Sequence, residues 1–305
     1  MVSVRKAVPA LWPVLALMLN AFVWGISWWP FRFLQSHGLH PLWSTALIYV
    51  LSLACLLALR PRALRSFAGQ PMLWLLVVAS GLTNVGFNWA VTVGDVVRVV
   101  LLFYLMPLWA VLLARWLLGE RITRAASLRI LLALLGAAIV LWPTSGSGAP
   151  GWQQLPIPRS LPDWLGVVGG FSFALNNVML RREAHRPAED RALAMFIGGV
   201  LVPGALATGL AWQGRVPWPP AVAPAWLGLA AGLSVLFLLS NLALQYGASR
   251  LPANVTSVVM VSEVVVASGS AVALGAGSLS APLLVGGTLI VLAALLAAAK
   301  GSGAH

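Results

Sequence analysis

The chain has 305 residues, of which 60% are hydrophobic and only 9% charged, whereas soluble domains carry roughly 25% charged residues. This composition excludes a water-soluble globular protein, because so little polar surface could not cover so much apolar surface in water. The formal net charge of +12 does not indicate a nucleic-acid-binding protein, because the Lys and Arg residues lie in short segments between long apolar runs.

Ten apolar runs follow one another along the chain, each near the roughly 20 residues needed to cross a bilayer. Their length and their lack of alternating polarity predict helices rather than strands. We therefore expect an all-α membrane protein with ten transmembrane helices. In chain order the runs are Leu11 to Phe33, Leu42 to Leu59, Met72 to Val93, Val97 to Leu118, Ala126 to Trp142, Trp164 to Leu180, Leu193 to Trp212, Ala225 to Tyr246, Ala253 to Leu274 and Ala281 to Ala299.

The distribution of Lys and Arg predicts the orientation of these helices. If the N-terminus is cytoplasmic, all but four of the 19 Lys and Arg residues lie in cytoplasmic segments. The four outside are Arg32, Arg98, Arg159 and Arg215. Cytoplasmic loops of membrane proteins carry such an excess of positive charge, so both termini are expected inside.

The chain reads as a duplicated unit. Asn88 to Gly94 and Asn241 to Gly247 share the pattern N-x-A-x-x-x-G at the end of the third and eighth runs, and Ser27 of the first run stands opposite Asn176 of the sixth. The fourth and ninth runs align less closely, with Met106 opposite Glu263. Because each unit holds an odd number of helices, the second would cross the membrane inverted relative to the first. Inverted repeats are typical of transporters that work by alternating access.

This duplication predicts the domain organisation. We expect a first five-helix repeat over residues 1–145, a Pro- and Gly-rich linker on the outer side over 146–162, and a second five-helix repeat over 163–305.

Short motifs in the first half resemble those of a known family. They are the Leu105 to Leu108 segment with its proline, the Leu117 to Thr123 segment (Leu-Leu-Gly-Glu-Arg-Ile-Thr), and the Gly136-containing run that follows. With these motifs the chain resembles the drug/metabolite transporter superfamily, in its ten-helix EamA-type branch. In the second half, Gly275 to Ser280 stand where the Gly-Glu-Arg-Ile-Thr element is expected, and the Glu is missing.

Within that superfamily the chain is most similar to bacterial aromatic amino acid exporters. The resemblance implies export of amino acids, aromatic ones favoured, across the bacterial inner membrane, driven by a gradient or by facilitated diffusion. The expected partners are the small-molecule substrate and the lipid bilayer, and the sequence does not define an oligomeric state. The alternatives are a multidrug, cation or other metabolite transporter of the same fold, and an intramembrane enzyme.

Glu263 is the one acidic residue of the chain that falls near the middle of an apolar run. A carboxylate there costs roughly 2.5–3.5 kcal/mol on insertion scales, so it needs a compensating contact or a wet cavity. It could bind a substrate ammonium group or carry a proton. Alternatively, it is a neutral glutamic acid hydrogen-bonded between helices.

Aromatic side chains within the first, third and fourth runs could stack an aromatic or cationic solute. Trp24 and Trp28 are four residues apart and so share a helix face. Tyr104 and Trp109 lie in the fourth run. Plain packing against lipid or neighbouring helices is an equally good explanation for each of these residues.

Amide side chains within the runs should point into the bundle, because an amide in hydrocarbon needs a partner. That partner is either another helix, or water and substrate. The candidate substrate-binding amides are Asn84, Asn88, Asn176, Asn177, Asn241 and Gln245.

Other residues have structural explanations. Pro30, Pro107 and Pro203 are candidate hinges, because proline loosens a helix. Gly198, Gly199, Gly228 and Gly232 should allow close helix packing. The single cysteine, Cys55, is expected to be a small buried apolar residue.

No cofactor, metal ion or catalytic group is expected. All four His residues lie in predicted loops or in the tail, and the runs hold no pair of metal ligands and no Ser/His pair. A phosphate-binding loop of the ATP-using type is missing, which argues against direct ATP use. A channel is less favoured than a carrier, because no ring of charges or repeated filter loop is visible.

Overall fold

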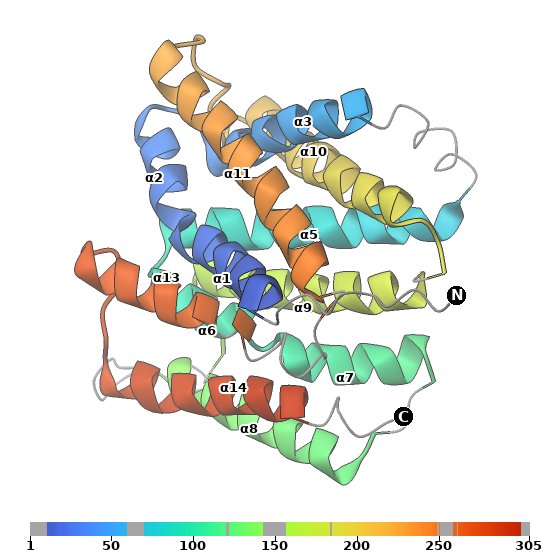
Figure 1. Ribbon diagram of the computed structural model, residues 1–305. Coiled ribbons are helices and arrows are strands. Elements are labelled where there is room, and N and C mark those ends of the chain that lie inside the picture. Colours follow the sequence, from blue (N-terminus) through green and yellow to red (C-terminus); the bar gives the residue numbers. More distant parts are fainter. Residues whose placement is uncertain are drawn as a thin grey trace, which may run out of the picture.

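The computed structural model describes residues 11–59, 70–119, 122–142, 157–183, 185–248, 250, 259–260 and 262–299. These residues form helices joined by turns, and no strand occurs among them (Figure 1). The helices are α1 (Leu11–Ile26), α2 (Trp28–Ser36), α3 (Pro41–Leu59), α5 (Pro71–Val93), α6 (Val96–Phe103), α7 (Met106–Leu117), α8 (Arg124–Val140), α9 (Leu161–Arg182), α10 (Ala188–Trp212), α11 (Pro224–Ala248), α13 (Ser262–Ala273) and α14 (Ala281–Ala299). The predicted all-α class is confirmed for this part of the chain.

Six helical stretches among the described residues are long and apolar enough to cross a membrane. They comprise α1 with α2, α3, α5, α6 with α7, α10, and α11. Three further apolar helices, within α8, α13 and α14, are shorter. Helix α9 is long but carries several Gly and Asn residues, which lower its hydropathy. The set of ten transmembrane helices therefore stays a prediction.

Two of the predicted helices are each broken into two. The first run divides at Ser27, between α1 and α2, and Pro30 follows in the first turn of α2. Proline has no N–H with which to bond the carbonyl four residues earlier, so the helix is interrupted there. The fourth run divides at Tyr104 and Leu105, and Pro107 is near the start of α7. The side chain of Pro107 lies outside the described residues, and Pro203 lies inside the unbroken helix α10.

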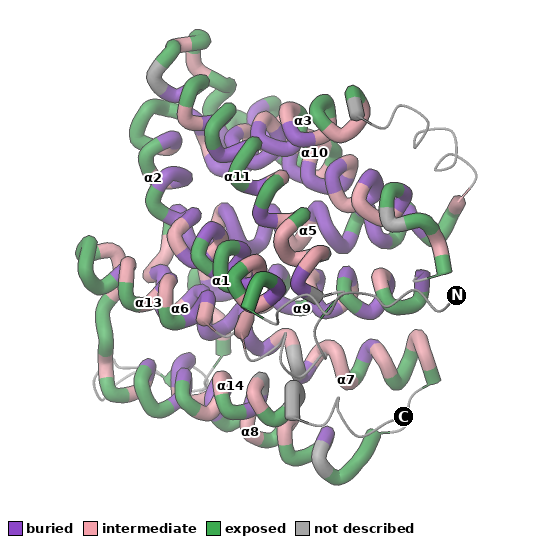
Figure 2. The backbone as a smooth tube through the Cα atoms, in the orientation of Figure 1, coloured by how far each residue is buried: buried purple, intermediate pink, exposed green. Residues whose placement is uncertain are grey.

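Among the six membrane-length stretches, that of α5 is the most enclosed, with 72% of it buried against 28% for that of α11. It packs on α9 and α10. Figure 2 shows the complementary pattern at the periphery, where exposed residues follow the outer faces of α8, α11 and α14. Those faces are apolar, with Leu131 and Leu284 each more than half exposed. An exposed apolar surface of this extent is stable in contact with lipid rather than with water.

Glycines permit several close helix crossings. A Cβ on Gly136 of α8 would lie 2.6 Å from the carbonyl oxygen of Gly286 in α14, and a Cβ on Gly286 would lie 2.6 Å from the oxygen of Gly136. Gly198 and Gly199 likewise face α5 and α3 closely, as predicted. Gly228 and Gly232 do not, since nothing lies within 4 Å of a Cβ at either position. The prediction for those two was wrong, because α11 turns that side away from its neighbours.

Residue contacts fix the relative directions of the helices. Gly86 of α5 meets Gly169 of α9, and Gly94 just after α5 meets Pro162 at the start of α9, so these two helices are antiparallel. Gly25 of α1 lies against Val266 of α13, and Trp28 of α2 bonds Ser270 of α13. The contact moves toward the C-terminus on both sides, so the α1–α2 segment runs parallel to α13.

Cys55 is exposed on α3 and not buried as predicted. The composition of its run could not reveal which face of the helix meets the surroundings, because all faces of α3 are apolar.

Candidate functional site

Tyr104 and Glu263 meet in the interior, where α6 ends and α13 begins. Tyr104 is 2% and Glu263 8% exposed. The Tyr104 hydroxyl lies 3.0 Å from the carbonyl oxygen of Met260 and 3.3 Å from Oε2 of Glu263. A hydroxyl has a single proton to donate, so it either bonds a Glu263 carboxylate or bonds the carbonyl and accepts a proton from a neutral Glu263. Both alternatives raised by the sequence for Glu263 are thus compatible with this contact.

An aromatic cluster lies beside this pair. Trp24 stacks on Phe237 with ring centroids 4.7 Å apart, and its ring is roughly perpendicular to that of Phe87, with centroids 5.9 Å apart. Phe87 continues to Phe103 at 5.0 Å, and Phe103 to Phe173 at 5.4 Å. The cluster joins α1, α5, α6, α9 and α11.

Trp24 is partly accessible although it packs against two buried clusters. The exposed face of α1 carries Phe22, which is about 200° around the helix from Trp24 by helical geometry. Trp24 therefore lies on the side of α1 away from Phe22, where the helix packs against its neighbours.

The predicted amides occupy different environments. Asn84 accepts a 2.7 Å hydrogen bond from the Tyr49 hydroxyl and donates to the Ser80 carbonyl. Asn88 donates to Thr45 Oγ1 at 3.2 Å. Asn241 donates to the carbonyl of Phe237 in its own helix, and the side chain of Gln245 lies outside the described residues.

Three amide oxygens in the buried interior lack a partner within the described part of the chain. They are Oδ1 of Asn20, Asn88 and Asn176, and the indole Nε1 of Trp109 shares this condition. An unpaired buried polar atom costs about 1–3 kcal/mol, so these atoms call for water or a ligand.

Asn177 is exposed on α9, and the prediction that it points into the bundle was wrong. Asn176 beside it is buried. Adjacent residues of a helix are about 100° apart, so the two amides cannot share the inward face.

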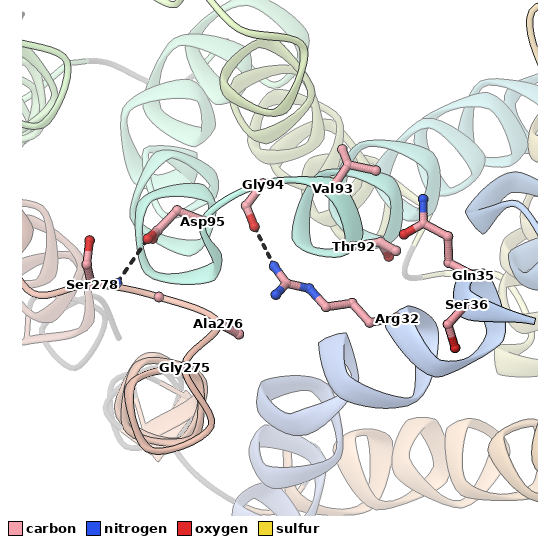
Figure 3. A pocket seen from close by; sticks show the side chains of 11 residues that line it. Arg32, Gln35, Ser36, Thr92, Val93, Gly94, Asp95, Gly275, Ala276 and Ser278 are labelled. Atoms are coloured by element: carbon pink, nitrogen blue, oxygen red, sulfur yellow. Dashed lines mark hydrogen bonds between the residues drawn. The ribbon is translucent and has the colours of Figure 1, made fainter.

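A pocket of about 710 Å³ opens at the end of the bundle where α2 and α5 end and α6 and α14 begin. We call this the outer end, after the predicted orientation. Figure 3 shows Arg32 of α2 reaching to Gly94, while Asp95 turns to Ser278 in the loop before α14. Arg32 donates from Nε to the carbonyl of Val91 at 3.2 Å and from Nη2 to that of Gly94.

Asp95 holds the opposite wall of this pocket together. One carboxylate oxygen caps α6 by accepting from the Arg98 N–H at 2.9 Å, and the other accepts from the Ser278 N–H at 3.0 Å. Val96 N–H also reaches the carbonyl of Ala276. The loop between α13 and α14 is thus docked on the junction of α5 and α6.

Next to the pocket, Arg98 forms an ion pair with Asp163, 2.7 Å from Nε to Oδ1. Asp163 precedes the apolar stretch that starts at Trp164. Burial by itself would raise the pKa of Asp163, but hydrogen bonding and charge from Arg98, with two backbone N–H bonds, hold it below the usual value. Asp163 is therefore an anion at neutral pH.

None of the residues predicted to bind substrate lines the outer pocket. Arg32 was not predicted from the sequence to bind a ligand. A signal was present, since Arg32 is four residues beyond Trp28 and eight beyond Trp24, on one helix face. In the structure its guanidinium lies 5.3 Å from the centroid of the Trp28 ring, and the Trp28 indole donates to Ser270 Oγ at 3.0 Å.

The apolar helices and the buried polar interior define a multi-pass membrane protein. Residues 11–142 match the model of the EamA-like transporter family, and this part of the chain is an EamA-like transporter domain of the drug/metabolite transporter superfamily. Members of this family are transporters and not enzymes.

Fourteen chains of solved structures match the fold. One of them, titled only "Crystal structure of protein", is 20% identical, with a TM-score of 0.54, over 93% of this chain and 96% of its own. At that identity it shows the fold alone. No curated protein matches the chain.

Proposed function

We propose that the protein exports small organic solutes, aromatic amino acids favoured, across a bacterial inner membrane by alternating access. In this proposal residues 1–145 and 163–305 are inverted five-helix repeats joined by the linker 146–162, and both termini are cytoplasmic. The membrane domain and the family match support a transporter of small molecules.

The proposal rests on two helix crossings between the halves that the repeat would relate to each other. The registers of the repeated sequence motifs place Asn20 opposite Gly169, and Phe87 opposite Ser240. Asn20 Nδ2 bonds Ser240 Oγ at 2.7 Å, where α1 crosses α11. A Cβ on Gly169 would lie 3.2 Å from the backbone nitrogen of Phe87, where α9 crosses α5. A pseudo-twofold axis relating the halves would pair these contacts.

A second contact along each of these crossings fits the same registers. They place Pro13 opposite Pro162, and Gly94 opposite Gly247. A Cβ on Gly247 would lie 2.8 Å from the carbonyl oxygen of Pro13, and a Cβ on Gly94 would lie 3.0 Å from Cγ of Pro162. The motif registers thus pair the contacts of α1 with α11 and those of α5 with α9 along the length of both crossings, which favours a repeat over a chance likeness.

The interior supports an amphipathic solute with an aromatic part and a cationic group. Trp24 offers a partly accessible aromatic ring on the packed side of α1, and Glu263 offers the carboxylate. The unpaired oxygens of Asn88 and Asn176 are acceptors available for water or an ammonium group. We infer that Glu263 takes the ammonium group and that Trp24 stacks on the ring.

The proposal is tested by counterflow in proteoliposomes that contain the purified protein and a panel of solutes, with and without a pH gradient. Phenylalanine, tyrosine and tryptophan should exchange faster than alanine or glutamate. Exchange of another solute class alone would overturn the amino acid assignment. An absence of exchange for every solute would overturn the transport function.

A further inference from the structure

The outer pocket has the size of a small-molecule site. It is separate from the aromatic cluster and the Tyr104–Glu263 pair, which together we call the central cluster. Its volume of about 710 Å³ falls within the roughly 300–1,000 Å³ usual for ligand sites. Its walls come from the end of α2, the junction of α5 and α6, and the loop before α14. Neither Glu263 nor Tyr104 lines it.

Arg32 is the cation that lines this pocket, and not all of its N–H donors are used by the residues that the structure describes. A guanidinium carries five N–H donors in a planar fork. Nε and Nη2 donate to the carbonyl oxygens of Val91 and Gly94 at the end of α5. Nη1 has no partner in the described part of the chain, and Arg32 lines the pocket, so the remaining donors are available to a ligand. These fixed bonds, and the Trp28 ring 5.3 Å away, hold the fork in place without a ligand.

Asp95 offers less to a ligand. Each of its oxygens already accepts a backbone N–H, from Arg98 and from Ser278, and these bonds hold the pocket wall. A cationic ligand group would also have to lie near the Arg32 guanidinium. The pocket therefore favours an anionic group over a cationic one.

We propose that the outer pocket is a carboxylate-binding subsite, in which Arg32 takes the carboxylate of the solute that leaves the central cluster. A carboxylate matches the planar fork by accepting two parallel hydrogen bonds. Trp24, Trp28 and Arg32 follow one face of the α1–α2 segment, and this face leads from the aromatic cluster to the pocket. The inference rests on the proposed export function and narrows it to solutes that carry a carboxylate.

The test uses two half-analogues of phenylalanine and purified protein in detergent, with binding measured by calorimetry. N-acetylphenylalanine has the carboxylate without the ammonium group, and phenylalaninamide has the reverse. Arg32→Gln should weaken binding of N-acetylphenylalanine by at least about tenfold, and Arg32→Lys should weaken it less. Binding of phenylalaninamide should not change.

Arg215→Gln is the matched control, because Arg215 is exposed in the loop after α10 and does not line the pocket. It removes the same charge and should leave N-acetylphenylalanine binding unchanged. If Arg32→Gln does not fold, Ser36→Asp takes its place. Ser36 is exposed, lines the pocket and bonds only within its own segment, so a negative charge there should repel the carboxylate.

The inference is overturned if wild-type protein does not bind N-acetylphenylalanine, or if the Arg32 and Ser36 variants bind it as wild type does. Equal losses in Arg32→Gln and Arg215→Gln would also overturn it, because the effect would then be one of net charge. Failure of amino acid counterflow together with Arg32-dependent binding would remove the proposed export function and leave the subsite in place.

Discussion

At the scale of single residues, the contact between Glu263 and Tyr104 separates two roles for the buried acid. If Glu263 is ionised during turnover, Glu263→Gln removes the charge and keeps the shape. Transport should then fall strongly, with substrate affinity weakened by about 1.5–3 kcal/mol for one lost charge-assisted hydrogen bond. Initial rates of counterflow across pH 6 to 8, compared with wild type, measure this.

Glu189→Gln provides the control for that experiment. Glu189 is exposed in the first turn of α10, so removal of its charge should leave transport unchanged. A Glu263→Gln protein that transports at the wild-type rate throughout the pH range would establish Glu263 as a structural, neutral acid.

The ion pair of Asp163 and Arg98 gives a prediction on pH and stability. Because the pKa of Asp163 is lowered on folding from its ordinary value of 3.8, its contribution is fully present above that value and is lost as the pH falls through the folded-state pKa. Asp163→Asn should lower the free energy of unfolding at pH 7 by about 1–3 kcal/mol. It should also reduce the loss of stability on acidification below about pH 4.

Thermal unfolding in detergent at pH 7 and at successively lower pH measures both effects. Asp163→Asn protein whose unfolding temperature matches wild type at pH 7 would contradict the first expectation. A full acid-induced loss in that variant would contradict the second.

Residue environments were predictable only in part. The sequence singled out Glu263 by its position in an apolar run, and the structure buries it. It could not separate Asn176 from Asn177, because both lie in the same run and only the phase of α9 against its neighbours decides which one is buried. Arg32 and Asp95 were not predicted to line one pocket, since their proximity depends on how α2 packs against α5.

At the scale of helices, the crossing of α8 and α14 gives the next prediction. Gly136→Ala should lower the free energy of unfolding by about 1–3 kcal/mol, because its Cβ would lie 2.6 Å from the Gly286 carbonyl oxygen and the helices must move apart. Gly228→Ala should be neutral or slightly stabilising, because a Cβ there meets nothing within 4 Å and alanine favours the helix. Thermal unfolding of the two variants in parallel makes the comparison, and equal stabilities would count against the crossing.

The break between α1 and α2 yields a prediction on transport. Pro30→Ala supplies an N–H that can bond the carbonyl of Ile26 and allows the two helices to become one. If the break is a hinge, Pro30→Ala should slow counterflow while substrate binding and folding remain. Pro41→Ala is the control, because Pro41 is the first residue of α3, where no helical N–H bond is needed. Equal rates for Pro30→Ala and wild type would exclude the hinge.

Helix positions were predictable where long apolar runs lack interruption, as for α3, α5 and α10. The breaks within the first and fourth runs were not, although the prolines were noted, because proline is accommodated without a break in α10 at Pro203. Whether a proline breaks its helix or is accommodated depends on whether neighbouring helices keep the segment straight.

For the molecule as a whole, orientation is the property to measure. Single cysteines in place of Arg215 and Arg182, in a Cys55→Ala background, report the two sides. Both positions are exposed, and Cys55 has to be removed because it is exposed too. With cytoplasmic termini, an impermeant thiol reagent added to spheroplasts should label the Arg215→Cys protein and leave Arg182→Cys unlabelled. The reverse pattern would invert the proposed topology.

The membrane class and the family resemblance followed from composition and short motifs, and both are confirmed. The repeat, its orientation and the substrate stay proposals. Composition determines that lipid is the solvent of the chain, but substrate choice depends on a few contacts whose geometry no apolar run encodes.

The two crossings that the proposed repeat would relate to each other differ in chemistry. An amide of Asn20 bonded to Ser240 joins α1 to α11, whereas close backbone contact at Gly169 joins α9 to α5. Were the halves identical, the inward- and outward-open conformations would have equal free energies. If the protein works by alternating access as proposed, the unequal crossings lift that degeneracy, and the empty carrier should prefer one resting conformation. About 1.4 kcal/mol of difference would populate one conformation tenfold over the other, and Asn20→Ala should shift that equilibrium constant.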